Sequence, residues 1–250
     1  MNVEELDERI KALESQVKSL QKLQDIEDIK KLQKAYGYYL INWMHEELID
    51  CFSNSPDTIL EWPPGTFFGK DGARRFFGNI NKNKDPEFMH QMMQISGIVN
   101  IETDGNKAKG RWWGFGAMAI PASSIDRKGE GIEQSISCGI YEMEYIKEDG
   151  VWKILKMKWV PVYSGSLEEG WVKPERLSKK RRKRDIAESY PESWAQDGPP
   201  AGIQYTYPSG YILPFHYTHP VTKKKTTESV RNASVLGVKS NSNGNKPKGI

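Results

Sequence analysis

The sequence predicts an α+β protein in which helices come first and pack on one face of a curved, mostly antiparallel sheet. Helical periodicity dominates the chain as far as residue 80, and four long strand-like segments then follow one another between residues 89 and 163. Because helices and strands are segregated along the chain rather than alternating, the pattern favours helices on one side of a sheet over parallel βαβ units.

The composition of the chain argues against several classes of function. The 250 residues contain 36 basic and 33 acidic side chains, and the net charge of +3 argues against a nucleic-acid partner. No apolar run reaches the ~18 residues that a membrane span needs, and the acidic start "MNVEELDERI" does not resemble a signal peptide. Cys51 and Cys138 match no zinc or redox spacing, which suits a reducing compartment. We therefore expect a cytoplasmic protein without a membrane partner.

The first helix, over residues 1–23, has a heptad pattern. Its apolar residues recur with spacings of three and four: Val3, Leu6, Ile10, Leu13, Val17 and Leu20. β-Branched residues at one position and leucine at the other are typical of parallel two-stranded coiled coils. The seam is too short to hold alone, so two interpretations stay open: an oligomerisation helix supported by other contacts, or a helix that packs on its own domain.

After Gln24 the register changes, which predicts a second amphipathic helix. Its apolar stripe comprises Ile26, Ile29, Leu32, Tyr36 and Leu40. A short helix is expected near residues 46–52, followed by a strand in "DTILEWPPG" that a Pro-Gly turn closes. The segment "GKDGARRFFGNI" predicts a third short helix.

The sheet should consist mainly of four long strands. They are expected at residues 89–102, 106–120, 134–147 and 151–163. The first two are joined by "TDGN" and the last two by "KEDG", both of which are hairpin signals.

Residues 165–222 differ in character, being rich in proline, glycine and aromatic residues without a clean period. We expect an ordered, irregular arm that lies across the barrel or on an adjacent subunit, with His216 or Tyr217 near a cavity mouth. Residues 223–250 have the polar composition of a disordered tail. The basic run "KKRRKR" at 179–184 is open to two interpretations, a nuclear or nucleic-acid signal and a solvated helix start.

Taken together, "YGYYLINW", "ILEWPPGTFFGKDGARRFFG", "FMHQM", "IETDGNKAKG" and "GVWKILKMKW" resemble the SnoaL-like branch of the nuclear-transport-factor-2-like superfamily. Over residues 24–164 the resemblance implies a cone-shaped barrel, a bent sheet wrapped around helices with a deep apolar cavity. Its members include dehydratases, isomerases, cyclases, epoxide hydrolases and binding modules, so function has to be argued from the site.

The resemblance implies a catalytic histidine on the strand after the third helix, and His90 occupies that position. The aspartate that faces this histidine in the dehydratase members aligns with Ile41. A histidine needs no tuning to act as a base near pH 7, but its charged form is normally stabilised by a carboxylate. Three glutamates on neighbouring strands could replace the aspartate, depending on which face each one occupies: Glu61, Glu142 and Glu144.

Other candidate residues follow from the same resemblance. Tyr36 would hydrogen-bond a carbonyl or a leaving hydroxyl, and Lys156 or Lys158 would stabilise an oxyanion. Tyr39 and Trp43 lie on or near the helical face of Tyr36. Flat apolar surface for a ring-bearing ligand would come from Trp62, Met92, Trp112, Trp113 and Tyr141. The alternative is that these residues are ordinary core or solvated side chains.

The sequence therefore predicts a cofactor-independent lyase, a dehydratase or a related retro-aldol elimination, that acts on an apolar, ring-bearing small molecule. His90 would be the general acid/base, assisted by Tyr36 and Glu61, and His216 would contact the substrate. No metal site is expected, because the prolines around His216 and His219 prevent a helix there. The alternative is a non-catalytic binding or interaction module. In either case we expect a homo-oligomer, a dimer or a trimer.

Overall fold

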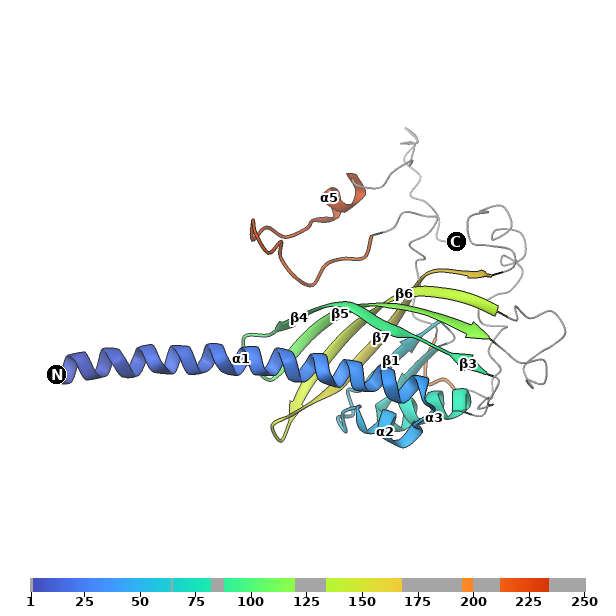
Figure 1. Cartoon of the computed structure of the whole chain (residues 1–250), viewed down its shortest axis with the longest axis horizontal. Coiled ribbons are helices and arrows are strands. Elements are labelled where there is room, and N and C mark those ends of the chain that lie inside the picture. Colours follow the sequence, from blue (N-terminus) through green and yellow to red (C-terminus); the bar gives the residue numbers. More distant parts are fainter. Residues whose placement is uncertain are drawn as a thin grey trace.

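The computed structural model describes residues 2–63, 65–81, 88–119, 134–167, 195–199 and 212–233. The first three helices lie on one side of a central sheet, and residues 212–233 lie on the other side (Figure 1). The basic run at 179–184 and most of the predicted arm fall outside these residues. None of the described helices combines the length and the apolar character needed to cross a membrane.

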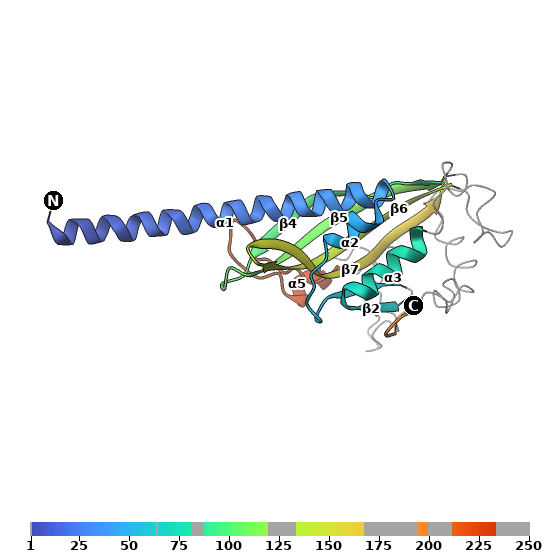
Figure 2. The same cartoon turned by 90° about the horizontal axis from the view of Figure 1, so that it is seen from below.

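Helix α1 (Val3–Ile41) is one continuous helix of 39 residues, so the predicted division after Gln24 is wrong. It begins with a capping box, in which Asn2 and Glu5 each accept a hydrogen bond from the other's backbone N–H. The apolar stripe changes face near Gln24 while the backbone stays helical. As a result, residues 3–24 are exposed and project away from the sheet (Figures 1 and 2).

Two shorter helices follow where the sequence predicts them, α2 (His45–Asp50) and α3 (Gly69–Asn81). Between them lies an antiparallel hairpin of β1 (Ile59–Trp62) and β2 (Gly65–Phe68), of which only the first strand was expected. Phe76 and Phe77 of α3 are buried against this hairpin and α1.

The rest of the sheet confirms the predicted strands with small changes of boundary. The strands are β3 (Met89–His90), β4 (Met93–Ile101), β5 (Lys107–Ala119), β6 (Gln134–Glu148) and β7 (Val151–Ser166). The seven strands run in the order β2-β1-β7-β6-β5-β3, and β4 also pairs with β5. All pairs are antiparallel except β1 with β7, so the sheet is mixed but mostly antiparallel.

Alternation along the strands assigns each side chain to the inner face, under α1, or to the outer face. Tyr141, Met143 and Tyr145 of β6 are buried in the core, whereas Glu142 and Glu144 between them point outward. The outer face also carries apolar side chains of β4 and β5 that are exposed to solvent: Met93, Ile95, Ile98 and Trp113.

A buried polar network fixes α1 on the sheet. Tyr145 Oη donates to Gln33 Oε1 (2.7 Å) and accepts from Trp112 Nε1 (2.9 Å). Gln33 Nε2 in turn donates to Gln94 Oε1 (2.8 Å) on β4. Because these groups satisfy one another away from water, they set the position of α1 more specifically than apolar contact alone could.

The described C-terminal segments attach at two places. Residues 195–199 extend the edge of β2, where Thr66 bridges Gly198 and Arg75 pairs with Asp197 (2.5 Å). Residues 212–233 lie along the outer face, and they include α5 (Glu228–Ala233). The predicted disordered tail therefore starts too early, because its first part contains a helix.

Candidate functional site

His90 lies on β3 at one end of the sheet. It pairs with Met118 of β5 and faces the side that α1 covers. Its ring centroid lies 6.0 Å from that of Trp43 and 6.3 Å from that of Phe88, and those two rings are 5.3 Å apart. Trp43 adopts a positive φ of 59° just after α1 ends, which turns the chain at the point where its ring meets the imidazole. His90 therefore packs beside two aromatic rings that also contact each other.

The surroundings of His90 set its protonation. Burial lowers the pKa of His90 to about 4, so the imidazole is neutral at pH 7. Its Nδ1 atom is buried and finds no hydrogen-bond partner among the residues that the structure describes. No carboxylate within the same residues forms an ion pair with it. The imidazole is thus available as a proton acceptor, but no carboxylate among the described residues compensates the positive charge of its protonated form.

Tyr36 occupies the middle of the interior. Its ring makes edge-on contacts with Phe52, Phe77 and Tyr141 at centroid distances of 6.1–6.4 Å. The hydroxyl lies beside Tyr141 but has no hydrogen bond of ordinary geometry to any described residue. Burial, assisted by Tyr141, raises the pKa of Tyr36 well above 10, so the group stays protonated and can only donate or accept a hydrogen bond.

Most of the predicted aromatic surface is on the same side of the sheet. Trp62 stacks on Trp159 at 5.6 Å with an interplanar angle of 14°, and its ring also approaches Tyr141. Tyr39 packs against the core and Met92 is buried in it. These contacts place the predicted residues in the interior, where their rings pack on one another.

Two other predicted residues have different surroundings. Trp112 is buried, but its indole N–H is committed to Tyr145, which gives it a structural role. Trp113, the next residue, points to the outer face and is 41% exposed.

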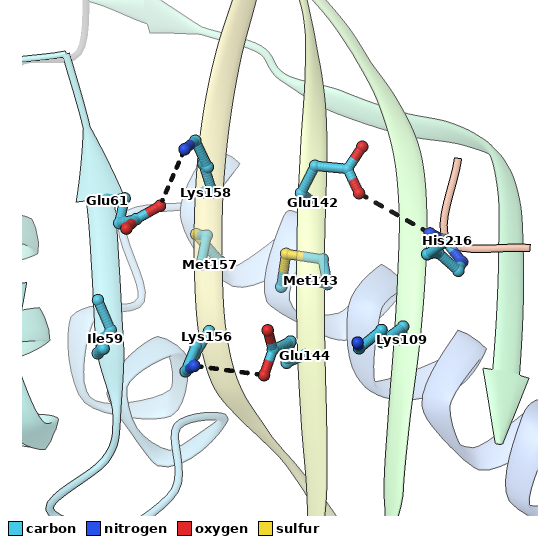
Figure 3. Close-up of a pocket in the computed structure, with 10 residues that line it drawn as sticks. All are labelled: Ile59, Glu61, Lys109, Glu142, Met143, Glu144, Lys156, Met157, Lys158 and His216. Atoms are coloured by element: carbon cyan, nitrogen blue, oxygen red, sulfur yellow. Dashed lines mark ion pairs between the residues drawn. The ribbon is translucent and has the colours of Figure 1, made fainter. Parts of the chain in front are cut away.

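The candidate carboxylates all lie on the outer face, away from His90. Glu61 pairs with Lys158 (3.3 Å) and Glu144 with Lys156 (3.5 Å), and both pairs cross neighbouring strands (Figure 3). Glu142 pairs with Arg111. The prediction that Glu61 assists His90 is therefore wrong, and neither Lys156 nor Lys158 points into the interior.

His216 was expected near a cavity mouth, but it lies over the outer face, with Nδ1 3.8 Å from Glu142 Oε2. It borders a shallow groove of about 260 Å³ between β1, β5, β6 and β7 (Figure 3). The groove is lined by Ile59, Glu61, Lys109, Glu142, Met143, Glu144, Lys156, Met157, Lys158 and His216. Its lysines and glutamates compensate one another, so the groove has no net attraction for an ion of either sign.

Within the described parts of the chain, no three histidine, cysteine, aspartate or glutamate side chains come together as metal ligands would.

Sequence reasoning missed Phe88 and Asp25. Phe88 could have been found by alternation, since it lies two residues before His90. Besides Gln21 one turn away, Asp25 is bonded by Lys147 and Trp152, which are more than a hundred residues away and are connected to it by no local pattern.

Comparison with known proteins supports the architecture. Residues 21–158 match the family profile of the SnoaL-like domain. Among solved structures, LinA is 18% identical with a TM-score of 0.51, over 62% of this chain and 98% of LinA. A candidate scytalone dehydratase from Novosphingobium aromaticivorans is 17% identical with a TM-score of 0.48, over 59% and 91% of the two chains.

A third solved structure is the LinA-type3 hexachlorocyclohexane dehydrochlorinase from Novosphingobium barchaimii. It is 19% identical with a TM-score of 0.47, over 62% of this chain and 99% of its own. No curated protein matches the chain. At these levels of identity the likeness concerns the fold.

Proposed function

The chain belongs to the SnoaL-like domain family, and from that premise we propose that it is a cofactor-independent lyase in which His90 is the general acid/base. The substrate class is an apolar, ring-bearing small molecule, and the reaction is the elimination of water or a related elimination. One observation carries the proposal: a neutral imidazole, whose Nδ1 atom is buried and has no hydrogen-bond partner among the described residues, packs beside the rings of Trp43 and Phe88.

The environment of His90 constrains the chemistry. Burial disfavours the imidazolium, so a substrate carbon acid has to develop negative charge while the proton moves. That requirement selects a C–H bond next to a carbonyl or conjugated with a phenol. In the elimination, His90 takes this proton and the C–H electron pair becomes the new double bond. The C–O bond breaks with its electron pair, and the oxygen leaves as water with the proton that the imidazolium returns.

Tyr36 is the proposed donor to a substrate oxygen. Its hydroxyl stays protonated, and no described residue uses it in a hydrogen bond of ordinary geometry. Tyr36 lies on α1, and Trp43 follows the end of that helix at Ile41. Tyr36 and Tyr141 are buried with their rings in contact, so a ring-bearing ligand has to part them to reach the Tyr36 hydroxyl.

The proposal is tested by turnover. Ring-bearing alcohols with a carbonyl or phenol conjugated to the departing hydroxyl are incubated with the wild type, with His90→Gln and with His216→Gln. His216 is the matched control, a second largely buried histidine on the opposite face of the sheet. We expect a loss of at least about a hundredfold in kcat for His90→Gln only. Equal turnover by the wild type and His90→Gln would remove His90 from the mechanism.

A second candidate function is non-catalytic binding of the same class of ligand. The family resemblance, which aligns Ile41 with the aspartate of the dehydratase members, favours it, and the candidate glutamates pair with Lys156, Lys158 and Arg111 on the outer face instead. Native mass spectrometry of protein isolated from its own host separates the two. A retained, unaltered ligand together with no turnover of any tested alcohol would favour binding, whereas a dehydrated product would favour catalysis.

A further inference from the structure

The first part of α1 has an apolar seam that no described part of the same chain covers. Its members are exposed by 42–83% of their surface: Val3, Leu6, Ile10, Leu13, Val17 and Leu20. Every residue from 3 to 24 is exposed, and this part of the helix projects well beyond the sheet (Figures 1 and 2). The helix therefore does not pack back on the described part of its own domain, which was one of the two interpretations of the heptads.

We propose that residues 3–23 form a parallel, two-stranded coiled coil with a second copy of this chain. In heptad notation, in which positions are lettered a to g, the a positions are all β-branched: Val3, Ile10 and Val17. The d positions are all leucine: Leu6, Leu13 and Leu20. β-Branched residues at a with leucine at d favour two parallel strands over three or four.

Charge complementarity gives the same orientation. In a parallel pair, a g residue faces the e residue of the next heptad of its partner. Here Arg9 at g faces Glu14 at e, and the two charges attract. In an antiparallel pair, e positions face e positions, which would bring Asp7 of one chain near Glu14 of the other. The flanking charges therefore favour the parallel arrangement.

The direction of the seam leaves room for both folded bodies. At 100° per residue, the seam points roughly 140° away from the stripe that α1 buries against the sheet. That stripe comprises Asp25, Ile29, Gln33, Tyr36, Gly37 and Leu40. Two helices joined along their seams would thus hold the two sheets on opposite sides of the helix pair, without collision.

The continuation of the seam explains where pairing ends. The next four a and d positions are polar or charged: Gln24, Glu27, Lys31 and Lys34. Glu27, Lys31 and Lys34 are exposed on the helix face opposite the sheet. In a parallel pair each of these side chains would meet its own copy, so like charges oppose each other beyond Gln24. The helices are therefore expected to separate there, which confines the coiled coil to the part of α1 that projects.

Sedimentation equilibrium of the full chain at micromolar concentration tests the pairing. We expect the wild type to be a dimer, Leu13→Glu to be a monomer, and Ser15→Glu to remain a dimer. The control adds the same charge on the opposite side of the helix, at an f position. Leu13 would be buried in the proposed dimer, so its replacement by glutamate should raise the dimer Kd by about a hundredfold or more. Equal melting of the folded body in all three proteins shows that Leu13→Glu acts on pairing and not on folding. A monomeric or trimeric wild type would overturn the proposal.

Orientation is tested by disulfide formation in Val3→Cys. In a parallel pair the two thiols lie opposite each other, within the Cα distance of about 7 Å that a disulfide requires. In an antiparallel pair they are roughly 25 Å apart, because position 3 then lies opposite position 20. Cys51 and Cys138 are buried and give little background. Rapid cross-linking on mild oxidation is expected, and its absence in a protein that is still dimeric would overturn the parallel orientation.

A charge reversal tests the pairing of Arg9 with Glu14. Arg9→Glu should weaken the dimer several-fold, and the double variant Arg9→Glu/Glu14→Arg should restore the wild-type Kd. If Arg9→Glu weakened the dimer only by changing the helix propensity, adding Glu14→Arg would not restore the Kd. Failure of the double variant to recover would show that these two residues do not face each other.

Discussion

The imidazole of His90 lies against the indole of Trp43, with ring centroids 6.0 Å apart and an interplanar angle of 48°. The contact joins the end of α1 to β3, the first strand after α3, and the Nδ1 atom of the imidazole is buried. It therefore has a consequence for stability as well as for chemistry, because a histidine that is buried in its neutral form couples folding to pH.

The first prediction is that this coupling is measurable. Burial lowers the pKa of His90 from 6.5 to about 4. Between these pH values the unfolded chain binds the proton and the folded chain does not. The free energy of unfolding should therefore fall as the pH drops from 6.5 toward 4, by up to about 3 kcal/mol from this group. Urea denaturation of the wild type and His90→Gln over this range measures the difference.

Other groups titrate in the same window, so the comparison with His90→Gln isolates the histidine. The wild type should lose more stability than the variant on acidification. A complementary measurement is the NMR titration of the His90 ring, whose signals should not shift between pH 8 and 5. Parallel stability curves, or a midpoint near 6.5, would contradict the proposed burial of a neutral imidazole.

The second prediction concerns Asp25, which ties α1 to the last hairpin. Its Oδ1 accepts hydrogen bonds from Lys147 Nζ at 2.6 Å and Trp152 Nε1 at 3.0 Å, and the residue is only 5% exposed. Asp25→Ala would leave both donors unpaired and should lower the free energy of unfolding by about 3 kcal/mol. Glu27→Ala is the control, since it removes only an exposed pair with Lys30 and should leave the free energy of unfolding nearly unchanged.

The carboxylate of Asp25 should also make the free energy of unfolding depend on pH in acid solution. Burial alone would raise the pKa of Asp25, but the hydrogen bonds from Lys147, Trp152 and Gln21 outweigh it and hold the pKa below 3.8. The stabilising contribution is therefore complete above pH 3.8 and is lost as the pH falls through the lower, folded-state pKa. Asp25→Asn should lack this acid-dependent loss. Equal slopes for Asp25→Asn and the wild type below pH 4 would argue against the ion pair.

Much of this architecture could be predicted from local patterns, because strand and turn signals in the sheet are short-range. The break predicted after Gln24 was wrong for a definite reason. A stripe that moves from one helix face to another looks like an interruption of the helix, although here the two faces serve different partners. The capping box at Asn2 and Glu5 predicts where the helix begins but not whether it continues.

The site was harder to predict because it depends on register. Moving a strand by one residue exchanges its two faces, and β6 against β7 contains two irregularities, between Cys138 and Gly139 and between Glu144 and Tyr145. Within β6, the alternation of apolar Tyr141, Met143 and Tyr145 with Glu142 and Glu144 favours the observed faces, but it does not show how β6 aligns with β7 across these irregularities. The position of His216 depends on how a long irregular segment returns to the sheet, which no local signal encodes.

The third prediction is that Arg111 anchors the C-terminal segment. Its guanidinium donates to the carbonyl of Pro214, pairs with Glu142 and lies 4.9 Å from the centre of the Phe215 ring. Arg111→Met keeps the methylene packing but removes these polar contacts. Amide hydrogen exchange in residues 212–217 should become faster, and the melting temperature should fall by a few degrees.

Lys109→Met is the matched control, because Lys109 lies two residues earlier on the same face and makes only an exposed pair with Glu102 (3.7 Å). It should leave exchange in residues 212–217 unchanged. Since this segment lies on the outer face, its release by Arg111→Met should not alter turnover at His90. Unchanged exchange in Arg111→Met would show that Leu213, which packs against the cluster of Ile140, Val160 and Val162, is sufficient as an anchor.

The last prediction contrasts glycines with opposite surroundings. Gly114 and Gly139 are paired across β5 and β6, and together they form a slot for the indole of Trp159. A Cβ at Gly114 would lie 2.5 Å from the Trp159 ring and 2.7 Å from the Tyr141 ring, so Gly114→Ala should destabilise the fold by about 1–3 kcal/mol.

Gly78 in α3 is different, because an added Cβ there meets only His45 Cε1 at 3.8 Å. Gly78→Ala should stabilise the protein by about 0.5–1 kcal/mol through the lower backbone entropy of the unfolded chain. Thermal and urea unfolding of both variants measure these effects, and a neutral Gly114→Ala would mean that Trp159 can move out of the slot at no cost.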